Sequence, residues 1–331
     1  MTLTQRPAPH VRHTDSITVS MADVLLALLP CLAMGVYYYG VRLLLQSAVA
    51  VLTALVTELA FALILRRRPT VGDLTAVVTG LIISLLLPVG LAYRYFVLAS
   101  AVAILVAKLM FGGVGKNIFN PALVGVTLVT LIDTAAATTC YAPHTKLPLW
   151  GAVPADTPVT TGVLSLLKQG EGAEMPSLLN VFIGKAGDVP ASVCLPVILA
   201  VGLYLVYRRI VSLHITLPLL GTVAVLALLF PRAGELTAAT VPEVIGGGLI
   251  FCAVFCANDP VTTPNTVGGQ VLFGIFTGII TMLIRWYGRF DDGIIFAVLI
   301  MNALSFALDK ATRKLRGRDK GGEKHAERPA A

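Results

Sequence analysis

Long apolar runs, separated by short polar or Gly- and Pro-containing stretches, fill most of the chain between residues 21 and 309. A helix that crosses the hydrocarbon core of a bilayer needs about 20 mainly apolar residues, and most of these runs are close to that length. The pattern therefore predicts ten membrane-spanning helices. They cover residues 21–39, 43–65, 74–92, 95–111, 119–136, 190–207, 213–230, 242–257, 270–286 and 293–309.

The third and eighth segments are short before they meet a helix breaker, at Pro88 and Pro260 respectively. Each is preceded by an acidic residue and glycine, and each is followed by another span, a glycine turn and a last span. This weak repeat predicts two halves of five helices, inverted relative to each other. Broken helices at matching places in inverted halves indicate a site near the membrane midplane. The alternative is that Gly and Pro are simply frequent in membrane helices.

The composition supports a membrane location. The chain of 331 residues is 56% hydrophobic and 13% charged, with a mean hydropathy of +0.84. A soluble domain carries about 25% charged residues. The polar, basic first 20 residues do not resemble a cleavable signal peptide. We therefore expect an all-α integral membrane protein with many spans.

The distribution of basic residues predicts the orientation, because cytoplasmic loops of membrane proteins are enriched in Lys and Arg. With the N-terminus inside, the cytoplasmic segments hold Arg66, Lys116, Arg208 and a tail with eight basic residues in 310–328. The external loops hold only single or spaced arginines. The net charge of +7 thus indicates a lipid-facing tail rather than a nucleic-acid partner.

These predictions divide the chain into five parts. Residues 1–20 form a cytoplasmic segment and residues 310–331 a basic cytoplasmic tail. Residues 21–136 and 190–309 form the two five-helix halves. Residues 137–189 form the one long external loop, and a loop of this length usually carries function or is disordered.

Residues 112–122 read GGVGKNIFNPA and join the fourth and fifth spans. Gly112 and Gly113 allow close approach of the backbone to another group. Asn120 before Pro121 is typical of a helix N-cap followed by the first helical residue. The amides of Asn117 and Asn120 must be satisfied at membrane depth, so they either stabilise the loop or bind a ligand.

Residues 257–264 read ANDPVTTP and follow the eighth span. Asp259 and Thr262 in this segment could cap a helix, coordinate a cation or bind a polar ring. A cytoplasmic turn capped by Asp259 is an equal alternative. The cysteines show no disulfide framework, and Cys252 and Cys256 fit packing residues better than metal ligands. We predict no metal site.

The external loop contains the stretch DTPVTTG at 156–162 and two candidate short helices, at 163–168 and Leu178–Ile183. Local spacing predicts that a threonine caps the first of these helices. The hydroxyls of Thr160 and Thr161 are candidates for modification, although spacing alone does not require it. No spacing of a nucleophile, histidine and acid, and no dinucleotide-binding fingerprint, is readable.

Several motifs together resemble a known family, the D subunits of the Rnf ion-translocating ferredoxin:NAD+ oxidoreductase, which is related to the B subunit of the sodium-pumping NADH:quinone reductase. The resemblance covers residues 9–309. Residues 112–122 are similar to the family's Gly-Gly-x-Gly-x-Asn-x-x-Asn-Pro-Ala motif, and 257–264 to its Ala-Thr-Asp-Pro-Val-Thr-Ser-Pro motif. The segments PHVR at 9–12, with Asp15-Ser16, and GIIFAVLIMN at 293–302 also match.

The resemblance implies a membrane flavoprotein that relays electrons between ferredoxin and NAD+ while the complex moves Na+ or H+. It implies FMN joined through its phosphate to a threonine of the loop between spans five and six, and a second, non-covalent flavin such as riboflavin. The implied partners are the C, G, E, A and B subunits, a flavin transferase and lipid, in the bacterial inner membrane. The chain is not catalytic alone. The second flavin, or an ion path, would use Gly112, Gly113, Asn117, Asn120, Asp259 and Thr262.

The loop departs from the family's motif around the modified threonine. Only a one-residue gap aligns Thr161 with that position, or less well Thr160, so we expect the linkage at Thr161. Two other functions compete with the flavin relay. One is a channel or secondary transporter with a midplane site, and the other is a scaffold that has lost its flavin sites.

Overall fold

The computed structural model describes residues 17–66, 71–113, 115–154, 156–170, 175–192, 194–232 and 236–326. The N-terminal motif at 9–12 and 15–16, part of the arginine cluster that begins at Arg66, and the last residues of the basic tail lie outside the described residues. Val114 of the glycine motif also lies outside them.

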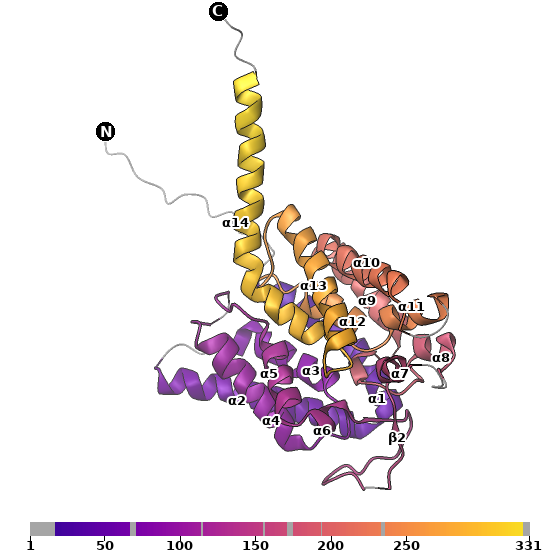
Figure 1. Ribbon diagram of the computed structural model, residues 1–331. Helices are drawn as coiled ribbons and strands as arrows, with labels where there is room; N and C mark the ends of the chain where they lie inside the picture. Colours follow the sequence, from indigo (N-terminus) through magenta and orange to yellow (C-terminus); the bar gives the residue numbers. More distant parts are fainter. Residues whose placement is uncertain are drawn as a thin grey trace, which may run out of the picture.

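The described chain is almost entirely helical (Figure 1). The first half contains α1 (Ile17–Tyr39), α2 (Val41–Ile64), the 3-10 turn η1 (Val71–Asp73), α3 (Thr75–Leu86), α4 (Tyr93–Val102), η2 (Ala103–Leu109) and α5 (Pro121–Ile132). The second half contains η3 (Pro190–Ser192), α9 (Leu195–Tyr207), α10 (Leu213–Leu229), α11 (Leu236–Ile245), α12 (Leu249–Phe251), η4 (Cys252–Cys256), α13 (Val267–Tyr287) and α14 (Ile294–Ala326). Each of the ten predicted segments contains helix.

Four helices are long and apolar enough to cross a membrane, namely α1, α2, α13 and the part of α14 from Ile294 to Arg313. Shorter apolar helices, including α3, α5, α9 and α10, accompany them. Large apolar side chains also face outward on these helices, with Leu63 70% and Leu203 72% exposed. Such surface apolar patches are typical of a protein surrounded by lipid.

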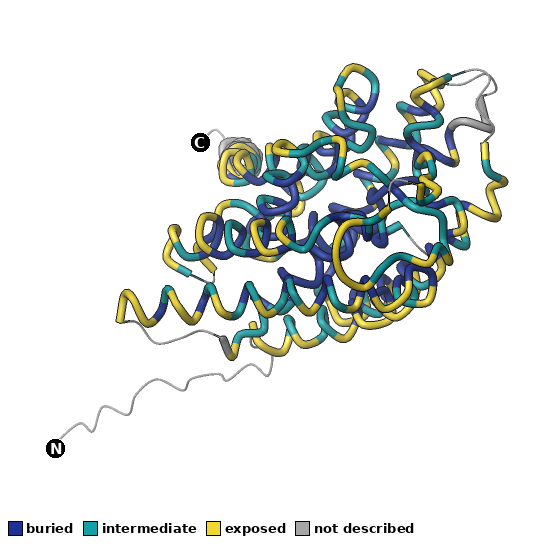
Figure 2. The backbone as a smooth tube through the Cα atoms, turned by 90° about the horizontal axis from the view of Figure 1, so that it is seen from below, coloured by how far each residue is buried: buried dark blue, intermediate teal, exposed yellow. Residues whose placement is uncertain are grey.

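Two short helical segments lie at the centre of the fold. Nearly every residue of α3 is buried, as is every residue of α12 and η4, and buried backbone gathers in the middle of the molecule (Figure 2). The third segment ends where the sequence indicated, because α3 stops at Leu86, two residues before Pro88. Elements that are apolar on all sides are expected to be enclosed by others.

The two halves pack in a similar order. In the first half α2 packs against α3 and α4, and α4 packs against α5. In the second half α10 packs against α11 and α13, and α13 packs against α14. The halves meet where α1 contacts α9 and where α5 contacts α14.

Some predicted boundaries are wrong. The segment 242–257 is not one helix, because residues Gly246, Gly247 and Gly248 separate α11 from α12, and Gly247 has a left-handed φ of 66°. The fifth segment ends earlier, since the Asp133 side chain caps a new helix, α6 (Thr134–Thr138). The last helix does not end at residue 309, and α14 extends away from the body on the side opposite β2 (Figure 1).

The long loop has its own secondary structure. The strands β1 (Cys140–Tyr141) and β2 (Val159–Thr160) pair antiparallel, with Cys140 opposite Thr160. The two predicted short helices are confirmed as α7 (Val163–Gln169) and α8 (Leu178–Ile183). The predicted threonine cap is wrong, because Gly162 is the N-cap of α7 and no side chain caps it.

Candidate functional site

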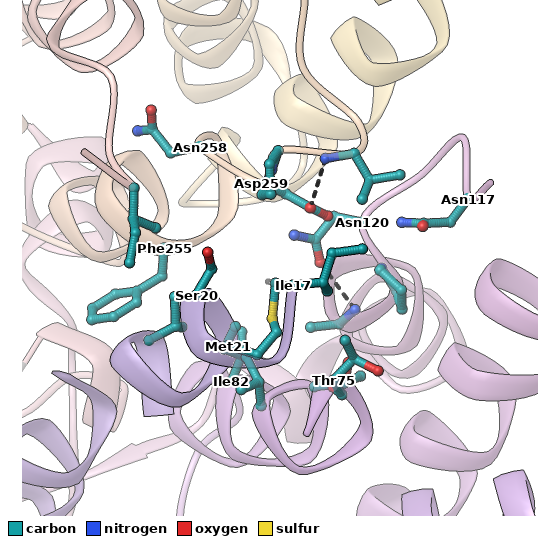
Figure 3. Close-up of a pocket in the computed structure, with 18 of the residues that line it drawn as sticks. Ile17, Ser20, Met21, Thr75, Ile82, Asn117, Asn120, Phe255, Asn258 and Asp259 are labelled. Carbon is teal, nitrogen blue, oxygen red and sulfur yellow. Dashed lines mark hydrogen bonds between the residues drawn. The ribbon is translucent and has the colours of Figure 1, made fainter. Parts of the chain in front are cut away.

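Two cavities lie at opposite ends of the central helices. We call the larger one, of about 390 Å³, the asparagine cavity (Figure 3). It is lined by α1, by the beginning of α3, by the beginning of α5 and by the segment that follows η4. Its polar lining residues are Ser20, Thr75, Thr79, Lys108, Asn117, Asn120, Asn258 and Asp259. Three predicted site residues, Asn117, Asn120 and Asp259, are therefore brought together from two motifs that lie far apart in the sequence.

Asn120 stabilises the start of α5 and ties it to η4. Its Oδ1 accepts the N–H groups of Ala122 at 3.0 Å and Leu123 at 3.3 Å, so the predicted N-cap is confirmed. Its Nδ2 donates to the carbonyl of Cys256 at 3.4 Å. The side chain is thus mainly structural, and it forms a wall of the asparagine cavity.

The segment after η4 holds two polar residues in different roles. Asn258 is fully engaged, since its Oδ1 accepts the Ser212 N–H at 2.8 Å and its Nδ2 donates to Thr216 Oγ1 at 2.9 Å. Asp259 Oδ1 accepts the Val261 N–H at a longer 3.2 Å. Removal from water raises the pKa of Asp259 to about 6, against the lowering effect of hydrogen bonds from Val261 and Thr262. Asp259 is the more available of the two for a ligand or a proton.

Among the other predicted residues, Asn117 lines the asparagine cavity, whereas Gly112, Gly113 and Thr262 are not among its lining residues. Gly112 and Gly113 have φ of 106° and 99°, and their N–H groups bond to the carbonyls of Leu109 and Lys108. They end the helical segment η2, which explains why glycine is needed there. Thr262 is 1% exposed in the turn beyond Asp259. Asn117 does line the cavity, and its Nδ2 donates to Phe119 O at 3.3 Å.

An ion pair that the sequence motifs did not identify also borders the asparagine cavity. Lys108 Nζ lies 2.7 Å from Glu58 Oε1 and 2.8 Å from Thr75 Oγ1, and the two charged side chains are 3% and 1% exposed. Lys108 belongs to a π-helical segment, a feature often found at functional sites. The sequence does carry a signal for Lys108, because a charged residue inside an apolar span is a candidate functional residue by default.

The second cavity, of about 100 Å³, lies beside the long loop. We call it the aspartate cavity, because Asp188, Asp291 and Asp292 line it together with the loop residue Gly162. Asp188 Oδ2 accepts the Gly247 N–H at 3.1 Å, and Asp292 Oδ2 accepts the Gly248 N–H at 2.8 Å. Two carboxylates from distant elements thus face one glycine turn at the start of α12.

The carboxylates of the aspartate cavity differ in their charge partners. Asp292 Oδ1 accepts from Arg285 Nη2 at 3.0 Å, and Arg285 also pairs with Glu243 at 3.0 Å. Asp188 has backbone donors, the Val189 N–H at 2.8 Å and the Gly247 N–H. Burial raises the pKa of Asp188 to about 6, with the neighbouring Asp292 adding to the rise.

The two candidate threonines have different surroundings. Thr160 is half-buried in β2, and its Oγ1 points to the carbonyl of Gly187 at 3.5 Å. Thr161 is exposed and lies directly beyond the strand, next to Gly162 of the aspartate cavity. Of the two residues, Thr161 is the more exposed.

The central helices connect the two cavities. The beginning of α3, up to Ile82, lines the asparagine cavity, and its end, at Leu86 and Leu87, lines the aspartate cavity. The α12–η4 segment runs the other way, with Gly248 at the aspartate cavity and Phe255 at the asparagine cavity. The helical step from Ile82 to Leu86 spans roughly 6 Å at about 1.5 Å per residue, so the linings of the two cavities come within about one turn of each other along α3.

A profile of the NQR2, RnfD, RnfE family matches residues 4–317. The chain belongs to this family. It is 33% identical over 317 residues to the D subunit of the Na(+)-translocating ferredoxin:NAD(+) oxidoreductase complex of Acetobacterium woodii, with 95% of each chain covered.

Two further family members are also similar along nearly their whole length. The D subunit of the proton-translocating ferredoxin:NAD(+) oxidoreductase complex of Clostridium ljungdahlii is 33% identical, covering 93% of this chain and 94% of the relative. The D subunit of the ion-translocating oxidoreductase complex of Actinobacillus pleuropneumoniae is 30% identical, covering 92% and 96%. These relatives are subunits of ion-translocating oxidoreductases, which act as complexes, and the predicted family is confirmed. The helices and the family together make the chain a multi-pass membrane protein.

The asparagine cavity has the size and lining of a cofactor site. Its volume falls within the range of about 300–1,000 Å³ of small-molecule sites, which are mainly apolar with a few placed polar groups. Asn117, Asp259 and Lys108 supply those polar groups. The aspartate cavity is below this range, so a flavin linked at Thr161 would place at most an edge there. Within the described residues, no group of three or more His, Cys, Asp or Glu side chains is arranged to hold a metal ion.

Proposed function

We propose that this chain is the flavin-bearing electron relay of a membrane-bound, ion-translocating ferredoxin:NAD+ oxidoreductase. The observation that carries the proposal is the pair of cavities at opposite ends of the antiparallel segments α3 and α12–η4, one beside Thr161 and one lined by Asn117 and Asp259. Two redox groups held at these places would be near enough for electrons to pass between them. The chain itself supplies position and electrostatics, and a bound flavin supplies the one- and two-electron chemistry.

The proposal includes ten membrane crossings in two inverted halves, with both termini in the cytoplasm of a bacterium and the chain in its inner membrane. The matched packing order of the halves supports it. The contacts of the long loop also support it. Tyr39 at the end of α1 bonds to Asp188 of the loop, and Arg42 at the start of α2 bonds to Pro148 of the loop, so the α1–α2 connection and the long loop lie on the same side. This arrangement is expected when each segment crosses once.

We assign the covalent linkage of FMN to Thr161, through a phosphoester to its hydroxyl. The exposure of Thr161 and the contact of Thr160 with Gly187 support this choice. Maturation then requires a flavin transferase. The C, G, E, A and B subunits of the complex are the proposed partners for electron transfer and for coupling to Na+ or H+.

The linkage is tested by flavin fluorescence of the denatured protein on a gel, after co-expression with the flavin transferase. Thr161→Val is expected to abolish the fluorescent band, whereas the matched variant Thr160→Val keeps it. The reverse pattern would reassign the linkage to Thr160. A wild-type band without fluorescence would contradict a covalent flavin and favour a scaffold without this cofactor.

We place the second, non-covalent flavin in the asparagine cavity. Asn117→Leu and Asp259→Leu are expected to reduce the flavin released by denaturation to less than about one tenth of the wild-type amount, because each replaces a polar lining group of a mainly apolar site. Asn180→Leu, at an exposed position of α8, is the matched control. If the wild-type protein releases no flavin but carries ions across liposomes alone, the transporter alternative replaces this proposal.

A further inference from the structure

The segment 148–151 of the long loop is held at the end of a membrane-spanning helix. Arg42 is the second residue of α2 and is 1% exposed. Its Nη1 donates to the Pro148 carbonyl at 2.5 Å, and its Nη2 donates to the Gly151 carbonyl at 3.3 Å. The Tyr93 hydroxyl at the start of α4 donates to the Leu149 carbonyl.

These contacts place the segment at the membrane–water boundary. The helix α2 is long and apolar enough to cross a bilayer, so an arginine at its first turn belongs at the level of the lipid headgroups. A loop segment whose carbonyls bond to that guanidinium lies at the same level.

The segment nevertheless presents large apolar side chains outward. Trp150 is 70% exposed and Leu149 is 47% exposed, although the indole ring of Trp150 also lies 5.5 Å from the ring of Tyr93. Tyr37 and Val41, at the facing ends of α1 and α2, are 66% and 55% exposed. Aromatic side chains that are apolar at one end and polar at the other concentrate at membrane interfaces.

We propose that Leu149 and Trp150 insert into the interfacial layer of the phospholipid bilayer and hold the long loop on the membrane surface. Trp150 is the anchor, Tyr93 supports its ring, and Arg42 fixes the backbone on both sides of it. The loop that carries Thr160 and Thr161 is thereby held at one end by lipid. This inference depends on the position of α2 in the membrane and not on any bound flavin.

The chain offers a direct probe, because Trp150 and Trp286 are its two tryptophans. In the full-length Trp286→Phe variant, emission reports on Trp150 alone. The variant is reconstituted in phosphatidylcholine liposomes with or without bromine near the headgroup end of the acyl chains. We expect the brominated lipid to remove roughly half or more of the emission, and aqueous iodide to remove much less, as for an indole at the acyl–headgroup boundary.

The matched control moves the indole to another exposed site of the same loop. Val159 in β2 is 62% exposed and lies eight residues after Gly151, the last residue of the arginine-bound segment. In a chain with Trp150→Phe, Trp286→Phe and Val159→Trp, iodide is expected to quench and brominated lipid is not. In the purified complex, the emission of a chain with both Trp150→Phe and Trp286→Phe is subtracted from that of the Trp286→Phe chain, and the difference is the emission of Trp150.

Two results would overturn the inference. Quenching of Trp150 by iodide without an effect of brominated lipid would place the side chain in water. Quenching by brominated lipid in the isolated chain that disappears in the assembled complex would show that another protein of the complex covers this surface. Quenching by brominated lipid in both preparations supports the anchor.

Discussion

The two halves of the molecule each bury a basic side chain near the end of a helix, and they stabilise it differently. Lys108 in the first half pairs with Glu58 and Thr75, and it lines the asparagine cavity. Arg285 in the second half is 0% exposed and bridges Glu243 and Asp292.

The difference reflects the chemistry of the two cations. A guanidinium presents several donors in a planar fork, so Arg285 can join two carboxylates from different elements. An ammonium is a compact charge, so Lys108 makes fewer contacts and can still face a ligand. We infer that Arg285 holds the aspartate cavity together, whereas Lys108 contributes a positive charge to the asparagine cavity.

The largest loss of stability is expected for Arg285→Gln. It leaves Asp292 without the Arg285 guanidinium, whereas Glu243 keeps its ion pair with Arg232. Breaking a buried ion pair costs about 3–5 kcal/mol. Thermal unfolding of the purified protein in detergent measures the loss. Arg289→Gln changes an exposed arginine on the same side of the molecule and should have almost no effect. Equal unfolding temperatures for the two variants would contradict the structural role of Arg285.

A smaller effect is expected at the other pair. Lys108→Met removes the ammonium beside the buried Glu58 carboxylate and should cost roughly 3 kcal/mol. Adding Glu58→Gln removes the remaining charge, so the double variant should recover most of the stability. The content of the proposed non-covalent flavin should be lower than in the wild type in both the single and the double variant, because both lack the Lys108 ammonium in the asparagine cavity. If the stability losses of Lys108→Met and Glu58→Gln alone add up to the loss of the double variant, Lys108 and Glu58 are not coupled.

The smallest expected effect on stability is a dependence on pH that arises from Asp188. Its pKa is raised from 3.8 to about 6 by burial, so the folded state binds a proton more tightly than the unfolded state. The contribution of Asp188 to stability is therefore greatest below about pH 4, falls as the pH rises towards about 6, and is constant above that.

Asp188→Asn should remove this part of the pH dependence. The difference in unfolding temperature between wild type and variant, followed from acid to neutral pH, isolates the contribution of one group. A difference that does not change with pH would show that Asp188 does not titrate in this range.

The sequence alone determined what depends on near neighbours. Apolar run lengths predicted where helix would form, the Asn120-Pro121 pair predicted the start of α5, and Pro88 predicted the early end of α3. These signals are local, since capping and helix breaking involve residues within one turn. The ordered motifs were also sufficient to indicate the family, because they are read directly from the chain.

The tertiary structure decided which distant groups meet. Glu58 and Lys108 are 50 residues apart, and their pairing depends on how α2 and η2 face each other. The same holds for Asp188 and Gly247. Of the glycine motif, Gly112 and Gly113 end a helix while Asn117 reaches the cavity, a division that spacing could not predict.

The two candidate threonines show the same limit. Thr160 and Thr161 are neighbours of identical chemistry in the sequence, and the structure distinguishes them by the packing of Gly187 against Thr160 and by the greater exposure of Thr161. Side-chain contacts of this kind depend on the three-dimensional arrangement of the loop, which brings residues 160 and 187 together, and not on the local spacing of residues along the chain.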